Sequence, residues 1–127
     1  MSIRAMVIDD DPAIREMLEF SLGLEGYDVS TAPDGTSALN ALRIERPDVI
    51  VLDVMMPLLN GYQVLQRLRE LEDHAFTPVI FLTAKATDEE VWEGWSKGAD
   101  SYITKPVDMD VLVGEIERVI AARGVAA

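Results

Sequence analysis

The chain of 127 residues is predicted to adopt an α/β fold, an open, doubly wound parallel sheet with helices on both faces. The apolar run from Val49 to Leu52 has no polar alternation, which indicates a strand buried on both faces, as in parallel sheets covered by helices. Strand-like and helix-like segments alternate along the chain. The length suits one domain and excludes a closed eightfold barrel, which needs roughly 200 residues or more.

Five short segments are predicted to be strands. Each is rich in apolar or β-branched residues, and turn-forming glycine, proline or acidic residues lie between them. The third strand delivers one carboxylate, Asp53, at its carboxyl end, and the chain breaks at Pro57 soon after. The predicted strands are Ile3–Ile8, Tyr27–Ala32, Val49–Asp53, Pro78–Thr83 and Ser101–Thr104.

Five helices are predicted from apolar residues at helical spacing and from capping signals. Asp11 caps the first helix, which carries Pro12 in its first turn and stops at Gly23. Asn60-Gly61 opens the third helix, and residues 87–90 resemble a capping box at the start of the fourth. The residues expected to face inward are, helix by helix, Ile14, Met17, Leu18 and Leu22; Ala38, Ala41 and Leu42; Val64, Leu65, Leu68 and Leu71; Val91 and Trp95; Leu112, Ile116, Val119 and Ile120.

Composition and charge exclude several classes of function. The chain has 23 acidic and 11 basic residues, a net charge of -12, and such a field repels nucleic-acid phosphates, so we expect no direct nucleic-acid binding. It has no cysteine and therefore no disulfide, thiolate nucleophile or zinc-thiolate site. It also has no apolar stretch long enough to span a bilayer, and no secretory leader precedes the first strand. We expect a soluble, cytoplasmic protein without membrane contact.

Polar residues stand at the carboxyl ends of the predicted strands. Asp9 and Asp10 follow the first strand, Asp53 and Thr83 end the third and fourth, and Lys105 follows the fifth. Parallel strands end at one edge of a sheet, so these five side chains should lie together. Three carboxylates repel one another unless a cation neutralises them, and oxygen ligands favour Mg²⁺. The sequence predicts a magnesium site, although any one of these acids alone could instead be a helix cap or turn residue.

The lysine and the threonine favour phosphoryl transfer as the chemistry of this site. Mg²⁺, an ammonium and a hydroxyl around one carboxylate stabilise charge on a transferring phosphoryl group. The carboxylate of Asp53 would be the acceptor and would form an acyl phosphate. The sequence contains no Walker loop and no glycine-rich nucleotide cradle, so the phosphoryl group must arrive on another molecule.

Several short motifs occur in a specific order at these strand ends. They are Val7-Ile8-Asp9-Asp10-Asp11-Pro12, Asp53-Val54-Met55-Met56-Pro57 with Gly61, Thr83-Ala84, Gly98-Ala99-Asp100-Ser101-Tyr102 and Lys105-Pro106. In this order, the whole chain resembles the receiver domains of two-component response regulators. The resemblance implies a flavodoxin-like (βα)5 sandwich with strand order 2-1-3-4-5.

The resemblance also implies a donor and a set of metal ligands. Asp53 would accept its phosphoryl group from a sensor histidine kinase or a histidine phosphotransfer protein. Mg²⁺ would be bound by Asp10, by Asp53 and by the main-chain carbonyl of Met55, with Asp9 contributing through water.

By the same resemblance, three more residues act after the phosphoryl group arrives. Thr83 would hydrogen-bond its oxygens, Lys105 would pair with them, and Tyr102 would turn inward when Thr83 moves. The Lys105-Pro106 bond is expected to be cis. The face formed by the fourth helix, fifth strand and fifth helix would then change, to control a partner, an output domain or homodimerisation. Apart from slow loss of its own phosphoryl group, the chain would not be an enzyme.

Two other functions compete with this interpretation. A magnesium-dependent phosphatase with an aspartyl nucleophile commonly has a second aspartate two residues later, where this chain has Met55, so nothing would protonate a leaving group. A flavin-binding module of the same strand order needs a phosphate-cradling loop after the first strand. There Asp9 to Asp11 would repel a phosphate.

Two tryptophans stand out in the predicted fourth helix. Trp95 is expected in the core, whereas Trp92 lies at the edge of the apolar face and is either an exposed anchor for a partner or part of the packing. Lys85, two residues after Thr83, is expected to be solvated, with tuning of dephosphorylation as the alternative.

The remaining unusual residues have ordinary interpretations. His74, the only histidine, is expected at the surface because it lies in a polar segment without a second histidine. Met55 and Met56 are expected to be apolar packing groups. Residues 1–124 are predicted to form a single receiver domain, with residues 125–127 a frayed tail or the start of a linker to an output domain, as in DNA-binding regulators.

Overall fold

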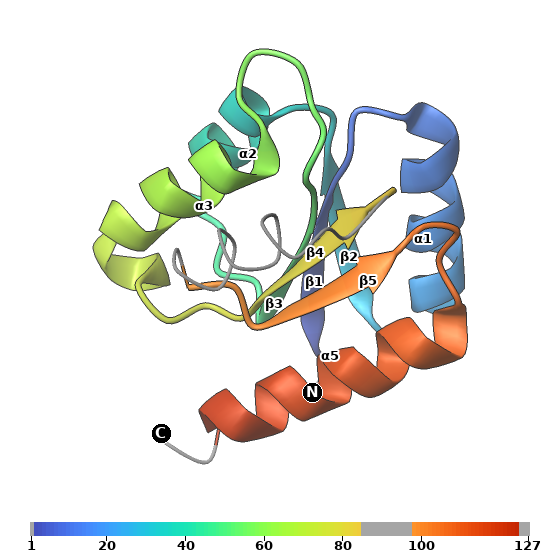
Figure 1. Cartoon of the computed structure of the whole chain (residues 1–127). Helices are drawn as coiled ribbons and strands as arrows, with labels where there is room; N and C mark the ends of the chain where they lie inside the picture. The colour runs from blue at the N-terminus through green and yellow to red at the C-terminus, as the bar shows by residue number, and fades with distance from the viewer. Residues whose placement is uncertain (1, 85–97, 125–127) are drawn as a thin grey trace.

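The computed structural model describes residues 2–84 and 98–124, which contain a five-stranded parallel sheet in the order β2-β1-β3-β4-β5 (Figure 1). This order confirms the predicted doubly wound fold. Among the described residues, no helix is long and apolar enough to span a membrane. The elements are β1 (Arg4–Ile8), α1 (Pro12–Leu24), β2 (Asp28–Ala32), α2 (Gly35–Ala41), β3 (Val49–Asp53), α3 (Gly61–Glu70), the short 3-10 helix η1 (Glu72–His74), β4 (Val79–Thr83), β5 (Ser101–Thr104) and α5 (Met109–Gly124).

The element boundaries differ slightly from the sequence prediction. β1, β2 and β4 each begin one residue later than predicted, and α1 continues past Gly23 to Leu24. Tyr27 belongs to the turn after α1, because its amide donates to the Leu22 carbonyl at 3.1 Å. Lys85 and the predicted fourth helix, which carries Trp92 and Trp95, lie outside the described residues.

Side chains cap three helices at their amino ends. Asp11 accepts a hydrogen bond from the Ala13 amide, as predicted, and Asp34 does the same for α2 by accepting from Ser37. Asn60 and Gln63 form a reciprocal capping box on α3. Because each cap follows a strand end by only a few residues, the helices start close to the carboxyl edge of the sheet.

The sheet separates two apolar layers. Side chains of successive strand residues point to opposite faces, so Ile50 and Leu52 join one layer while Val49 and Val51 join the other. Helices α2 and α3 cover the first face, and α1 and α5 cover the second (Figure 1). All five residues of β3 are buried, as its unbroken apolar run predicted. Of the residues predicted to face inward, Met17 is exposed instead.

His74 corrects the sequence prediction. It is 1% exposed rather than solvated, and its ring nitrogens Nε2 and Nδ1 lie 2.6 Å from the Leu42 carbonyl and 3.1 Å from Thr77 Oγ1. Nearby, the guanidinium of Arg69 donates to the carbonyls of His74 and Thr77. The polar sequence around His74 concealed a buried hydrogen-bonding role, in which the ring satisfies a carbonyl at the end of α2.

Candidate functional site

The three predicted carboxylates meet at the carboxyl edge of the sheet. β1 and β3 are neighbours, with Ile8 opposite Leu52, so Asp9 and Asp53 come next in register. One carboxylate oxygen from each of Asp9, Asp10 and Asp53 can be chosen so that all three lie within 4.8 Å of one another. Asp9 and Asp53 are 0% and 3% exposed, whereas Asp10 is open to solvent. The site is therefore a buried pair of carboxylates with a third at its rim.

Lys105 reaches this cluster from the loop after β5. Its Nζ lies 3.2 Å from Asp9 Oδ2 and 3.3 Å from Asp53 Oδ1, so one ammonium bridges two carboxylates. Its amide donates to the Thr83 carbonyl at 2.8 Å, which fixes the loop beside β4. The Lys105-Pro106 bond is cis, as the resemblance implied.

The charges of this cluster perturb one another strongly. Burial, followed by repulsion from Asp9, raises the pKa of Asp53 to about 7, although Lys105 counteracts the rise. Burial lowers the pKa of Lys105, but attraction to Asp53 and Asp9 outweighs it and the net pKa is raised. The ammonium of Lys105 therefore stays charged. The Asp53 carboxylate is charged only at a cost in free energy, which a second cation would reduce.

The donor set fits a hard divalent cation. All three groups supply oxygen, and Asp9 Oδ2 is buried without a hydrogen-bond partner, although the Lys105 ammonium lies close to it. Three carboxylates and one ammonium leave an excess of negative charge. Oxygen ligands that leave room for water suit Mg²⁺. These residues could hold such a metal.

Met55 differs in part from its prediction. Its amide donates to Asp53 Oδ1 at 3.2 Å, which holds the carboxylate against the loop after β3. Its side chain is 70% exposed rather than packed, while Met56 is buried as predicted. The chain turns away from the sheet directly after Asp53, which leaves the Met55 thioether in solvent.

Thr83 and Tyr102 lie on the two strands beside β3. Thr83, 3% exposed, ends β4 one residue beyond Leu82, the register partner of Asp53. Tyr102 is half-buried in β5, and its ring centroid lies 5.2 Å from that of Phe81. The structure thus brings all the predicted strand-end residues to one edge, with the aromatic ring on the adjoining face.

Gly61 allows α3 to start against the end of β3. A Cβ at this position would lie 2.5 Å from the Asp53 carbonyl oxygen and 2.9 Å from Val54 Cα. The Gly61 amide donates to the Val54 carbonyl at 2.9 Å. Only glycine permits this contact, because both neighbours are backbone atoms that cannot move aside.

Sequence reasoning missed Arg15 as a neighbour of the site. Its Nη1 donates to the main-chain carbonyl of Asp9 at 2.8 Å. One feature of the sequence could have indicated a role for Arg15. It places a cation close to the amino end of α1, where the helix dipole favours anions, so the stability of the helix does not explain the residue.

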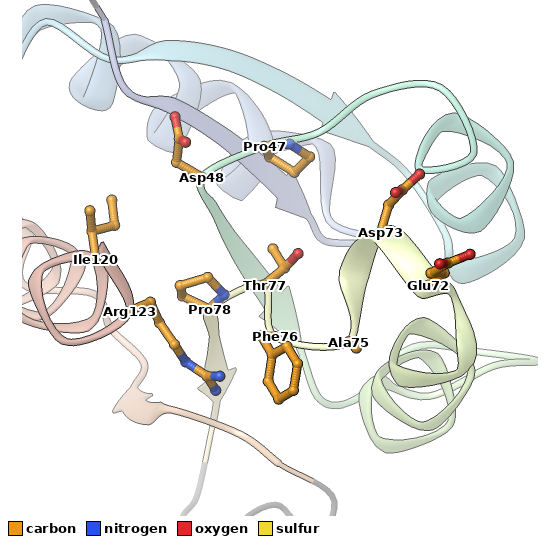
Figure 2. Close-up of a pocket in the computed structure, with 10 residues that line it drawn as sticks. All are labelled: Pro47, Asp48, Glu72, Asp73, Ala75, Phe76, Thr77, Pro78, Ile120 and Arg123. Atoms are coloured by element: carbon orange, nitrogen blue, oxygen red, sulfur yellow. The ribbon is translucent and has the colours of Figure 1, made fainter. Parts of the chain in front are cut away.

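A separate groove of about 630 Å³ lies at the opposite, amino edge of the sheet (Figure 2). Its lining includes Pro47 and Asp48, which precede β3, and Thr77 and Pro78, which precede β4. The exposed ring of Phe76 lies among them. None of the predicted site residues contributes to this groove.

A protein-family model, the response regulator receiver domain, matches residues 5–117. The chain belongs to this family. A relative from Mycobacterium tuberculosis, named "Probable transcriptional regulatory protein TcrX", is 40% identical over 123 residues, which are 97% of this chain and 52% of the relative. The response regulator MprA of Mycobacterium bovis is 42% identical over 120 residues, 94% of this chain and 51% of MprA. The receiver domain thus spans about half the length of these curated relatives.

Solved structures agree with the family assignment. The chemotaxis protein CheY4 of Vibrio cholerae has a TM-score of 0.91 at 34% identity, over 94% of this chain and 99% of that one. A CheY-like receiver domain protein of Methanospirillum hungatei has a TM-score of 0.93 at 26% identity, over the whole of both chains. The chain is therefore a phosphorylation-controlled switch of two-component signalling, and the comparisons give no support to a phosphatase.

Proposed function

We propose that Asp53 is the phosphoacceptor of this receiver domain. The observation that supports this proposal best is the buried Asp53 carboxylate, which shares the Lys105 ammonium with Asp9 and lies next to a third carboxylate. Receiver domains are generally phosphoacceptors rather than catalytic enzymes, and we propose the same role for this chain.

The transfer is a displacement at phosphorus. A carboxylate oxygen of Asp53 attacks the phosphorus of a donor phosphohistidine, the new P–O bond forms as the P–N bond breaks, and the imidazole leaves with the bonding electron pair. Lys105, already 3.3 Å from Asp53 Oδ1, pairs with the phosphoryl oxygens. In the metal-free fold, burial and Asp9 raise the pKa of Asp53 to about 7, and a bound cation would favour the ionised carboxylate that attacks phosphorus.

We propose Mg²⁺ as the resident metal. Asp10, Asp53 and the main-chain carbonyl of Met55 would hold it, and Asp9 would contribute through water. When bound, Mg²⁺ neutralises the carboxylates and the charge on the phosphoryl oxygens. Asp9 then keeps its place through the Asp11 amide, which donates to its Oδ1 at 2.9 Å.

The response to phosphorylation is proposed to pass through Thr83 and Tyr102. The phosphoryl group adds charge and acceptor oxygens beside the end of β4, which draws the Thr83 hydroxyl toward it. Tyr102 then turns inward, and the surface of the predicted fourth helix, β5 and α5 changes. That surface would control homodimerisation, a partner or an output domain.

Response regulators interact with sensor histidine kinases, and we propose such a kinase or a histidine phosphotransfer protein as the donor. The proposed output is control of transcription, because TcrX is named as a probable transcriptional regulator and is about twice the length of this chain. We propose that residues 1–124 form the receiver domain, and we also propose a cytoplasmic location and slow hydrolysis of the acyl phosphate.

Incubation with acetyl phosphate and Mg²⁺ tests this function. A single phosphoryl adduct should appear by intact mass in the wild type and in Asp28→Asn, which alters an exposed aspartate at the amino end of β2. It should be absent from Asp53→Asn, because an amide cannot accept the group. An adduct that persists in Asp53→Asn would show that another residue is the acceptor.

A further inference from the structure

Arg15 contacts the main chain of the acidic loop that follows β1. This half-buried residue of α1 donates from Nη1 to the carbonyl oxygen of Asp9 at 2.8 Å. That carbonyl belongs to the peptide bond that joins Asp9 to Asp10, two of the three clustered carboxylates. The orientation of this peptide plane sets the direction in which both side chains leave the backbone.

The position of Arg15 is not explained by the stability of α1. The helix begins at Pro12, so Arg15 is its fourth residue, and a cation near the amino end opposes the helix dipole. In residues 2–84 and 98–124, no carboxylate forms an ion pair with Arg15. Its one side-chain hydrogen bond there is the one to Asp9. The guanidinium is therefore placed where it serves the loop rather than the helix.

The other hydrogen bonds of the loop involve the Asp9 carboxylate and the Asp9 amide, whereas Arg15 binds the Asp9 carbonyl. The Asp9 carboxylate is fixed by the Asp11 amide at 2.9 Å, whereas the Asp9 amide makes only a long hydrogen bond of 3.3 Å to Ala32. Asp10 lies at the exposed rim. Loss of the guanidinium would remove this restraint on the peptide unit between Asp9 and Asp10 and would let the Asp10 carboxylate shift relative to Asp53.

We propose that Arg15 is a positioning residue of the magnesium site, which orients the Asp9-Asp10 peptide so that both carboxylates face the metal. This inference rests on the proposed function of the site. It concerns a group that would never touch the metal. Groups that orient metal ligands typically contribute tenfold or more to metal affinity.

The direction in which Mg²⁺ affinity changes when Arg15 is replaced distinguishes a positioning role from a simple effect of its charge. Arg15 is a cation near a cation site, so the loss of its charge alone would strengthen Mg²⁺ binding. Loss of the hydrogen bond would weaken Mg²⁺ binding, because the ligands would have to be ordered at the cost of binding free energy. A purely structural role would change the free energy of unfolding and leave the Mg²⁺ affinity as it was.

The test is isothermal titration calorimetry with MgCl₂ on wild type, Arg15→Met, Arg15→Gln and Arg15→Lys. Both neutral variants should fold, since they remove a cation from the start of α1. We expect Arg15→Met to bind Mg²⁺ about tenfold more weakly. Arg15→Lys, which keeps the charge and one donor, should recover part of the loss. Arg43→Met, an exposed arginine outside the site, makes the same change in net charge and should bind as wild type does.

A second readout is the rate of phosphorylation by acetyl phosphate as Mg²⁺ is varied. The Mg²⁺ concentration for half-maximal rate should rise in Arg15→Met, while the rate at saturating Mg²⁺ is retained. Affinity that is unchanged or tighter in both neutral variants would overturn the positioning role and leave the phosphoacceptor proposal intact. A wild type that neither binds Mg²⁺ nor forms the adduct would overturn the proposed function itself, and the positioning role with it.

Discussion

Three aspartates of this chain, Asp11, Asp53 and Asp100, have the same side chain and three different roles. Asp11 caps a helix in solvent. Asp100 accepts from the guanidinium groups of Arg69 and Arg123 and from the Val79 amide at the amino edge of the sheet. Asp53 has one ammonium and a second carboxylate as neighbours, and its pKa is raised to about 7 by burial and by Asp9. The surroundings, rather than the residue type, distinguish the three carboxylates.

At the same scale, His74 provides a prediction about stability. Replacement by leucine leaves the Leu42 carbonyl without its 2.6 Å partner in a buried position. We expect His74→Leu to lower the free energy of unfolding by about 1–3 kcal/mol, measured by urea denaturation, with phosphorylation at the far edge unchanged.

The control for His74 is Asp73→Ala, which removes an exposed ion pair with Arg46. Exposed pairs contribute about 1 kcal/mol or less, so this variant should stay close to wild type. If His74→Leu were as stable as Asp73→Ala, the buried hydrogen bond would not be a source of stability.

At the scale of elements, the junction of β3 and α3 connects the core to the site. β3 ends in Asp53, the loop folds back through Met55, and α3 begins at Gly61 against the Asp53 carbonyl. The capping box of Asn60 and Gln63 fixes the direction in which α3 leaves. A shift of α3 would therefore be transmitted to Asp53 through backbone contacts.

Gly61→Ala tests this junction. The added methyl would overlap backbone atoms at 2.5 and 2.9 Å, and we expect a loss of about 1–3 kcal/mol in the free energy of unfolding together with slower phosphorylation. Gly23→Ala is the matched control, because its Cβ would meet nothing within 4 Å inside α1. It should stabilise the protein by about 0.4–1 kcal/mol. Equal effects at both glycines would contradict the close approach at Gly61.

At the scale of the whole molecule, the acidic edge opposes folding. The ordinary pKa of Asp53, 3.8, applies to the unfolded chain, and in the metal-free fold the value is about 7. Between these values the folded protein holds a proton that the unfolded chain has lost, so the free energy of unfolding falls as pH rises. Above pH 7 the free energy of unfolding is lower than at acid pH by the full amount, on the order of a few kcal/mol.

This cost gives a prediction for thermal unfolding. In EDTA, the wild-type Tm should fall between about pH 4 and pH 8, and Asp53→Asn should remove much of the dependence because it has no proton to lose. Mg²⁺ at pH 8 should raise the wild-type Tm, since it binds the folded state and neutralises the carboxylates. A wild-type Tm in EDTA that did not fall over this range would contradict the raised pKa.

Much of the fold was predictable because the periodic patterns are local. The unbroken apolar run of β3, the Asp11 cap and the glycine and proline breaks each act within a few residues, and they gave the sheet and the described helices to within a residue or two at most boundaries. Strand ends that carry Asp9, Asp53 and Lys105 predicted a shared site because parallel strands end at one edge. The roles of these residues in phosphoryl transfer stay a prediction.

Long-range contacts account for what the sequence did not reveal. His74 lies in a polar stretch of the sequence, yet it is buried. Its hydrogen-bond partner, the Leu42 carbonyl at the end of α2, is 32 residues away in the chain. Met55 is apolar, yet the turn after β3 leaves it in solvent.

The sequence by itself determined the alternation of strands and helices and the Asp53 carboxylate at the end of a buried strand, because these depend on local spacing. Only the tertiary structure decided that Lys105 bridges Asp9 and Asp53 and that Arg15 holds the peptide between Asp9 and Asp10. Such contacts depend on how the loops fold over the carboxyl edge of the sheet. Packing, not periodicity, sets those loop paths.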